Sequence, residues 1–138
     1  MTSRKTLLLV GDTNRVKEFA GAFANAGTAT ETTGDNAGAL AYLKSADVLP
    51  DAVVFIVPVY WESVGGFVEA VRADPKLEKL PLVYLGDFIE ANDQLFLKRL
   101  GVFTLTLGPV PTEEAVRYIL KIITDTTYRV FDGHTQLG

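Results

Sequence analysis

The chain of 138 residues carries 13 lysines and arginines against 17 aspartates and glutamates, a net charge of −4 that disfavours a nucleic-acid binder with its usual basic face. Its 48% hydrophobic and 22% charged content disfavours disorder, and it shows neither a membrane-length apolar run nor a signal-peptide pattern, so we expect one cytoplasmic domain. The lack of cysteine excludes disulfides, thiol nucleophiles and cysteine-ligated zinc, and the single histidine, His134, excludes paired-histidine metal motifs.

Five runs rich in apolar or β-branched residues alternate with five segments of helical period. The predicted strands are Leu7–Val10, Thr28–Thr33, Asp51–Pro58, Pro81–Gly86 and Val102–Leu107. The predicted helices follow each strand, with apolar stripes at Val16–Phe23, Ala39–Leu43, Val64–Val71, a segment ending at Leu100, and Val116–Ile123. Residues 126–138 show no helical period and are expected to form an irregular or briefly extended tail behind a domain of residues 1–125.

Strands that alternate with helices indicate an α/β fold, with a parallel sheet covered by helices on both faces. In an open sheet of this kind, ligands and chemistry lie beyond the C-terminal ends of the strands. The residues that directly follow each strand are therefore the candidate site.

Several landmarks, in their order and spacing, resemble a response-regulator receiver domain of two-component signalling over residues 4–125. The landmarks are Lys5–Asp12, Pro50-Asp51, Gly65-Gly66-Phe67, Leu80-Pro81-Leu82-Val83, Gly101, Pro109 and Glu113-Glu114. The resemblance implies a flavodoxin-like, doubly wound sheet of five parallel strands in the order 2-1-3-4-5. It also implies a bacterial phosphorelay, with a phosphoryl-accepting aspartate at the end of the third strand.

The phosphoryl transfer that the resemblance implies needs parts that this sequence lacks. In the family, two acids after strand one help to bind Mg²⁺, an aspartate ending strand three attacks phosphorus, and a hydroxyl residue and a lysine hold the phosphoryl oxygens. In this chain Gly11 replaces one acid, Ile56 replaces the nucleophile, and glycines replace the hydroxyl residue and the lysine. The degenerate phosphorylation pocket consists of Gly11, Asp12, Ile56, Gly86, Asp87, Gly108 and Pro109.

The sequence therefore indicates a pseudo-receiver: a protein-interaction module in signal transduction that acts without phosphorylation, without a cofactor and without enzymatic activity. Its expected partners are other signalling proteins, and the family's usual dimer surface, made by helix four, strand five and helix five, implies a homodimer as a second mode. Neither nucleic acid nor membrane is expected as a partner. The alternative function is a sensor that binds a nucleotide or another small molecule over the glycine-lined strand ends.

The pocket residues leave two questions open. Asp12 and Asp87 either bind a residual cation, weakly because no phosphate acceptor accompanies them, or serve as a helix cap and a solvated side chain. The three glycines either leave room for a ligand or occupy tight turns that require positive φ, and no glycine-rich phosphate motif accompanies them. No metal is predicted, and Asp12 is the one weak candidate ligand.

A second group of residues has the character of a partner-binding surface. These interaction candidates are Tyr60, Trp61, Phe96, Phe103, Ala115, Tyr118 and Ile122. The two aromatic residues that follow strand three either anchor a partner or fold over the apolar pocket. The three residues of the last helix, off its predicted buried stripe, form either an interface beside the two phenylalanines or ordinary surface hydrophobics. His134 is expected to be solvated rather than to carry a phosphoryl group.

Overall fold

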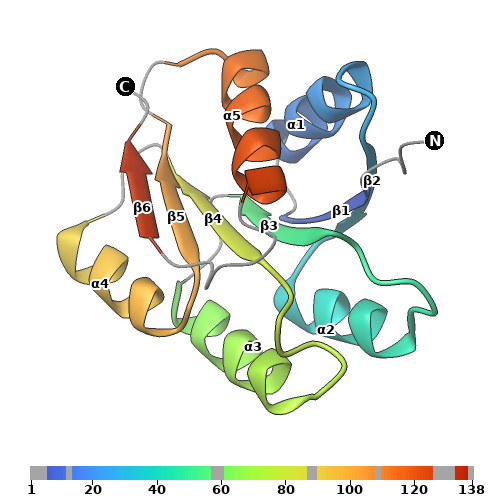
Figure 1. The fold of residues 1–138 in the computed structure, drawn as a ribbon, viewed down its shortest axis with the longest axis vertical. Coiled ribbons are helices and arrows are strands. Elements are labelled where there is room, and N and C mark those ends of the chain that lie inside the picture. The colour runs from blue at the N-terminus through green and yellow to red at the C-terminus, as the bar shows by residue number, and fades with distance from the viewer. Residues whose placement is uncertain are drawn as a thin grey trace.

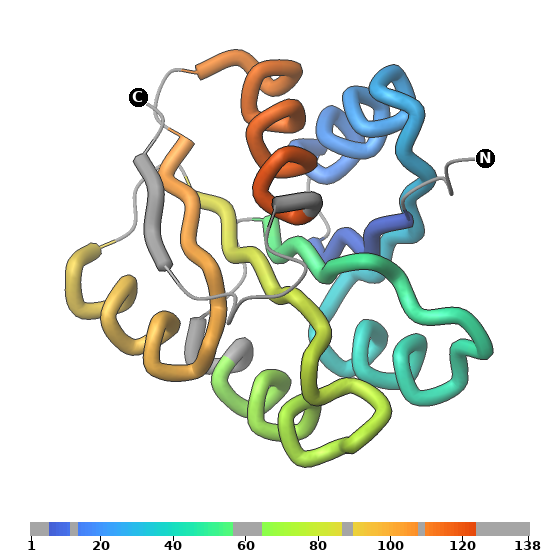
Figure 2. Tube along the Cα trace, viewed as in Figure 1, coloured from blue at the N-terminus to red at the C-terminus, as the bar shows by residue number. Residues whose placement is uncertain are grey.

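The computed structural model describes residues 6–11, 14–56, 61–86, 90–107, 110–125 and 133–136. Strands and helices alternate along this chain (Figures 1 and 2). The strands are β1 (Thr6–Val10), β2 (Ala29–Thr33), β3 (Ala52–Ile56), β4 (Leu82–Gly86), β5 (Phe103–Thr106) and β6 (Gly133–Gln136). The helices are α1 (Asn14–Asn25), α2 (Asn36–Ser45), α3 (Trp61–Ala73), α4 (Ala91–Arg99) and α5 (Thr112–Asp125). All five predicted strands and all five predicted helices are present.

All the strands pair in parallel in one sheet, in the order β2-β1-β3-β4-β5-β6. The predicted order 2-1-3-4-5 is confirmed. The sixth strand is an addition, because part of the predicted tail pairs with the outer edge of β5 (Figure 1). An edge strand offers unpaired N–H and C=O groups, so a polar segment without a strand pattern in its sequence can join it.

Alternate residues of the central strands β1, β3 and β4 enter two different cores, one on each face of the sheet. Val54 and Ile56 of β3 pack with α1 and α5, whereas Val53 and Phe55 pack with α2, α3 and α4. Figure 1 shows α1 and α5 on one side of the sheet and the other three helices on the opposite side. Burial on both faces explains why the central strands are apolar along their whole length.

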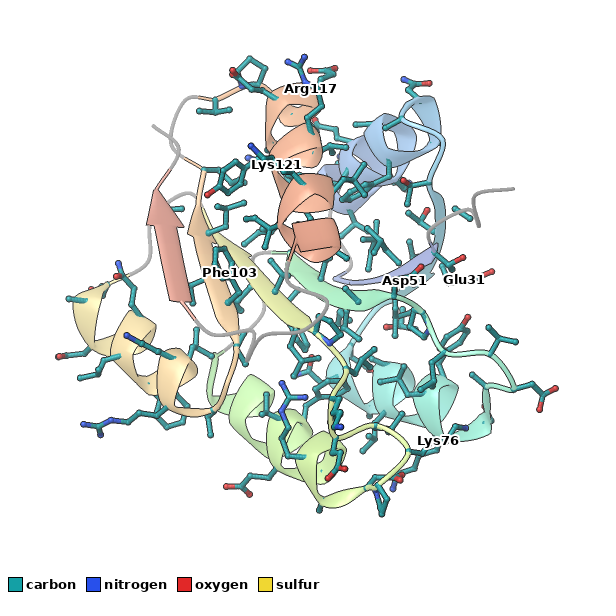
Figure 3. The ribbon with its side chains drawn as sticks, viewed as in Figure 1. Glu31, Asp51, Lys76, Phe103, Arg117 and Lys121 are labelled. Atoms are coloured by element: carbon teal, nitrogen blue, oxygen red, sulfur yellow. The ribbon has the colours of Figure 1, made fainter. Side chains whose placement is uncertain are left out.

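Two cations near the end of α3 tie neighbouring segments together through backbone carbonyls. The Arg72 guanidinium donates to the carbonyls of Glu78 at 2.8 Å, Leu80 at 2.9 Å and Gly101 at 3.1 Å. Burial lowers the pKa of Arg72 below its ordinary value. Lys76 donates from Nζ to the carbonyl of Ala46, 2.7 Å away, at the C-terminal end of α2 (Figure 3).

We expect the substitution Arg72→Met to lower the free energy of unfolding by about 2–3 kcal/mol, because it leaves three carbonyl groups without their charged donor. Urea denaturation measures this change. Arg99→Met is the matched control, since this arginine is exposed on α4 and its loss is expected to change stability by less than about 0.5 kcal/mol. Equal losses in the two variants would contradict the structural role of Arg72.

Candidate functional site

The candidate pocket lies at the C-terminal edge of the sheet, where β1, β3 and β4 end next to one another. The structure places Gly11, Ile56 and Gly86 at this edge. The other four residues of the predicted pocket, Asp12, Asp87, Gly108 and Pro109, lie outside the described residues. The geometry of the pocket is therefore described from Gly11, Ile56 and Gly86, at the ends of β1, β3 and β4.

Ile56 ends β3 at the position where the resemblance implies a phosphoryl acceptor. Its side chain is 1% exposed and belongs to the core cluster between the sheet, α1 and α5. In the sheet it pairs with Leu85 of β4, which is fully buried in the same cluster. The end of β3 is thus hydrophobic core, with no oxygen or nitrogen on this side chain to react with a phosphoryl group.

Gly11 follows β1 and is held where only a glycine fits well. Its φ is 152°, and its N–H donates to the carbonyl of Thr33 at 2.9 Å. A Cβ atom at this position would lie 2.8 Å from Cγ2 of Val16 and 3.0 Å from the carbonyl oxygen of Ile56. The space that a side chain would need is already filled by α1 and β3, which favours the turn interpretation of Gly11 over the ligand-room interpretation.

Gly86 differs from Gly11 in being a regular strand residue. It is the buried last residue of β4 and pairs with Thr106 of β5. Its carbonyl accepts from the N–H of Leu107 at 2.8 Å, which extends the ladder one residue further. Main-chain pairing to β5 therefore accounts for the backbone at Gly86.

No group of three histidine, cysteine, aspartate or glutamate side chains able to hold a metal ion occurs in the part of the chain that the structure describes. Asp12 and Asp87 fall outside that part. The expectation that no metal binds here, with Asp12 as the one weak candidate ligand, therefore stays a prediction.

The α5 candidates do not all lie at the surface, and one prediction is wrong. Ala115 is 1% exposed and packs in the core beside Val116, so it does not lie off the buried stripe. The stripe is wider than predicted, because α5 packs against both the sheet and α1. Tyr118 and Ile122 are half-buried at the margin of this core, and Phe103 of β5 lies at the same margin. We call Phe103, Tyr118 and Ile122 the α5 surface.

Phe96 is not part of the α5 surface, contrary to the prediction. It is 38% exposed on α4, and its ring lies over α3, with Cζ 3.4 Å from where a Cβ on Gly65 would be. Phe103 packs with α5 on the opposite face of the sheet. The sheet therefore separates the two phenylalanines. Tyr60 lies outside the described residues, and Trp61 is the first residue of α3, with its side chain outside them.

A hollow of about 430 Å³ lies beside the α5 surface. Its walls are formed by Val110, Glu114, Arg117, Tyr118 and Lys121. Arg117 and Lys121 project from α5 one helical turn apart (Figure 3). The hollow thus combines a tyrosine and an arginine, two residue types enriched at protein interfaces, with a lysine and a glutamate, which are more usual at the polar rim.

Comparisons with known proteins identify the fold. The chemotaxis response regulator CheY4 of Vibrio cholerae is 21% identical, with a TM-score of 0.73 over 88% of this chain and 99% of that one. The phosphorylated cyanobacterial phytochrome response regulator RcpA is 20% identical, with a TM-score of 0.75 over 91% and 97%. A response regulator in red light signalling of R. palustris is 16% identical, with a TM-score of 0.70 over 95% and 99%. The chain has a receiver fold.

The likeness to receiver domains is one of structure. No protein-family model matches the chain, and no curated protein matches its sequence. Within the described part of the receiver fold, no helix is both long and apolar enough to span a bilayer.

Two features of this receiver fold were not predicted from the sequence. The first is the pairing of β6 with β5: the tail is expected to be irregular or briefly extended, and the four residues of β6 carry no large apolar side chain to indicate a paired strand. The second is the hollow beside α5. A helical wheel places Glu114, Arg117, Tyr118 and Lys121 on one outward side of α5, so periodicity does contain a signal for this second feature.

Proposed function

We propose that this chain is a pseudo-receiver: a protein-interaction module of a cytoplasmic signalling pathway that works without phosphorylation and catalyses no reaction. The observation that carries the proposal is the buried Ile56 at the end of β3, the position where a receiver domain has its phosphoryl acceptor. The receiver fold supports a signalling role, and the net charge of −4 supports protein partners over nucleic acid.

The described part of the pocket is closely packed as well as chemically altered. A side chain at Gly11, where the resemblance implies one of the two acids, would meet Val16 and the backbone of Ile56. A covalent switch at this site requires a nucleophile with access to a phosphodonor, and neither is present at Ile56. We therefore expect the binding surface to keep one shape, set by the packing of the two cores, and not to switch with phosphorylation.

The α5 surface and the hollow beside it are the proposed binding site. Phe103 and Tyr118 provide half-buried aromatic side chains for a partner to pack against. Arg117 and Lys121 provide positive charges that favour a partner with carboxylates or other hydrogen-bond acceptors. A homodimer through α4, β5 and α5 is a second use of the same region. The alternative function, a small-molecule sensor, has less support because the room at Gly11 is filled.

Capture of partners from the native host tests this proposal. We expect the tagged chain to retain the same partner with and without a small-molecule phosphodonor. Tyr118→Ala and Lys121→Glu should each weaken capture by about fivefold or more, as loss of a central interface contact does. Val48→Ala is the control, because Val48 is 83% exposed in the segment that follows α2, outside α4, β5 and α5. Capture that requires the phosphodonor, or that the α5 variants do not change, would contradict the proposal.

A further inference from the structure

We propose that β6 is a removable cover of the β5 edge, and that an extended segment of the partner protein replaces it by pairing with β5. The inference rests on the proposed function for the existence of a protein partner. The inference adds two points: the partner pairs with the β5 edge, and its pairing segment is extended, with a bulky apolar residue opposite Phe103.

The register between β5 and β6 provides the first argument. Residues 133–136 pair in parallel with 103–106, so the β5 edge is able to accept a strand. Gly133 lies opposite Phe103, and a glycine has no side chain to cover its cross-strand neighbour. Phe103 accordingly stays partly exposed, although it packs against the α5 core. A partner strand with valine or phenylalanine at this position would bury Phe103 further.

The composition of β6 provides the second argument. Its sequence, Gly-His-Thr-Gln, holds only polar residues and glycine, so it has no apolar side chain with which to anchor itself. It pairs with β5 and lies close to α4. Net hydrogen-bond stabilisation per residue is similar in size to the entropy lost by ordering that residue. A competing strand that adds apolar contacts to the same main-chain pairing therefore binds more strongly.

The surroundings provide the third argument. Tyr118 and Ile122 are half-buried beside Phe103, on the face of the sheet that a replacing strand would reach with its alternate side chains. The hollow at Tyr118 and Lys121 continues this surface toward the start of α5. An incoming segment would thus meet the main chain of β5 and the ring of Phe103, with Arg117 and Lys121 on the neighbouring helix α5 (Figure 3).

A reversible lock on β6 tests the proposal, since the chain contains no cysteine of its own. Thr104 and His134 pair in register, and strands about 4.8 Å apart fall within the range that a disulfide spans. We expect Thr104→Cys/His134→Cys to form a disulfide in the folded protein. The probe is a fluorescent synthetic peptide of residues 129–138 that carries Gly133→Val, and the measurement is its anisotropy.

The reduced variant and the wild type should bind this peptide at least about tenfold more tightly than the oxidised variant does. The unmodified peptide of residues 129–138, the matched control, should bind more weakly than the valine peptide. Equal affinity in both redox forms, no binding to the reduced form at about 1 mM peptide, or failure of the folded variant to form the disulfide would each overturn the proposal.

A pair of proline variants gives an independent measurement. Consecutive N–H groups of an edge strand point to opposite sides, so only one of His134→Pro and Thr135→Pro removes a donor to β5. That variant should raise amide hydrogen exchange in residues 103–106 by about tenfold and leave β1 and β3 protected, while the other serves as its control. Global unfolding of either variant, or unchanged exchange in both, would mean that β6 is not a removable cover.

The outcomes separate this inference from the proposed function. A partner captured equally by the oxidised and reduced cysteine variants, without any phosphodonor, would leave the proposed function standing and overturn the strand replacement. A phosphoryl adduct on the chain would overturn the proposed function whatever the peptide does.

Discussion

The substitution Gly11→Ala is expected to lower the free energy of unfolding by about 3 kcal/mol. One contribution is steric, because the new Cβ would lie 2.8 Å from Val16 Cγ2 and 3.0 Å from the Ile56 carbonyl oxygen, and overpacking of this kind costs about 1–3 kcal/mol. The other is the backbone, since a φ of 152° is unfavourable for any residue with a Cβ and adds about 1–3 kcal/mol. Urea denaturation of the variant measures the sum.

Gly66→Ala is the matched control for Gly11→Ala. Gly66 lies exposed in α3, and a Cβ there would meet nothing within 4 Å. Alanine is the better helix former, so this variant should gain up to about 1 kcal/mol. If both alanines stabilised the chain, the end of β1 would have free room, and a ligand or an acidic pair at the pocket would become the better interpretation.

Ile56→Asp, which places a carboxylate where the resemblance to receiver domains implies a nucleophile, is expected to lower the free energy of unfolding by at least about 4 kcal/mol at neutral pH. The variant removes a buried aliphatic side chain, which costs about 2–5 kcal/mol in a core, and leaves a charge in its place. Thermal or denaturant unfolding between pH 3 and pH 8 measures the loss.

The pH dependence of Ile56→Asp has a definite sign. Burial raises the pKa of the introduced carboxyl above its value in the unfolded chain, about 3.9. The destabilisation is therefore greatest above the folded-state pKa, shrinks as the pH falls through it, and loses its proton-linked part below the unfolded-state pKa. Ile56→Val, the control, should cost about 1 kcal/mol at every pH. A stable, pH-independent aspartate variant would show that the end of β3 opens to solvent.

The architecture could be predicted because its signals are local and repeated. Five runs such as Leu7–Val10, each followed by an apolar helical stripe, are enough to indicate a parallel sheet, and the order of the first five strands is confirmed. The sequence also predicts that the third strand reaches Ile56 without meeting an aspartate, and Ile56 is the last residue of β3. What the sequence could not show is that Val16 and β3 close around Gly11, because this approach depends on how α1 packs.

The surface predictions failed where the outcome depends on packing between elements. Helical periodicity alone puts Ala115 outside the buried stripe, because it does not show that α5 contacts both the sheet and α1. Phe96 and Phe103 were grouped because their elements are neighbours, yet they lie on opposite faces of the sheet. The pairing of β6 with β5 could not be predicted, because the sequence Gly-His-Thr-Gln has no alternation of apolar and polar residues to indicate a strand.

Intact mass after incubation with acetyl phosphate and Mg²⁺ tests the central claim most directly, with a receiver domain that retains its aspartate as the positive control. We predict that the control gains one phosphoryl group and that this chain keeps its unmodified mass, because Ile56 has no atom that can accept the group. A stoichiometric phosphoryl adduct on this chain, located by fragmentation to Asp12 or Asp87, would contradict the account.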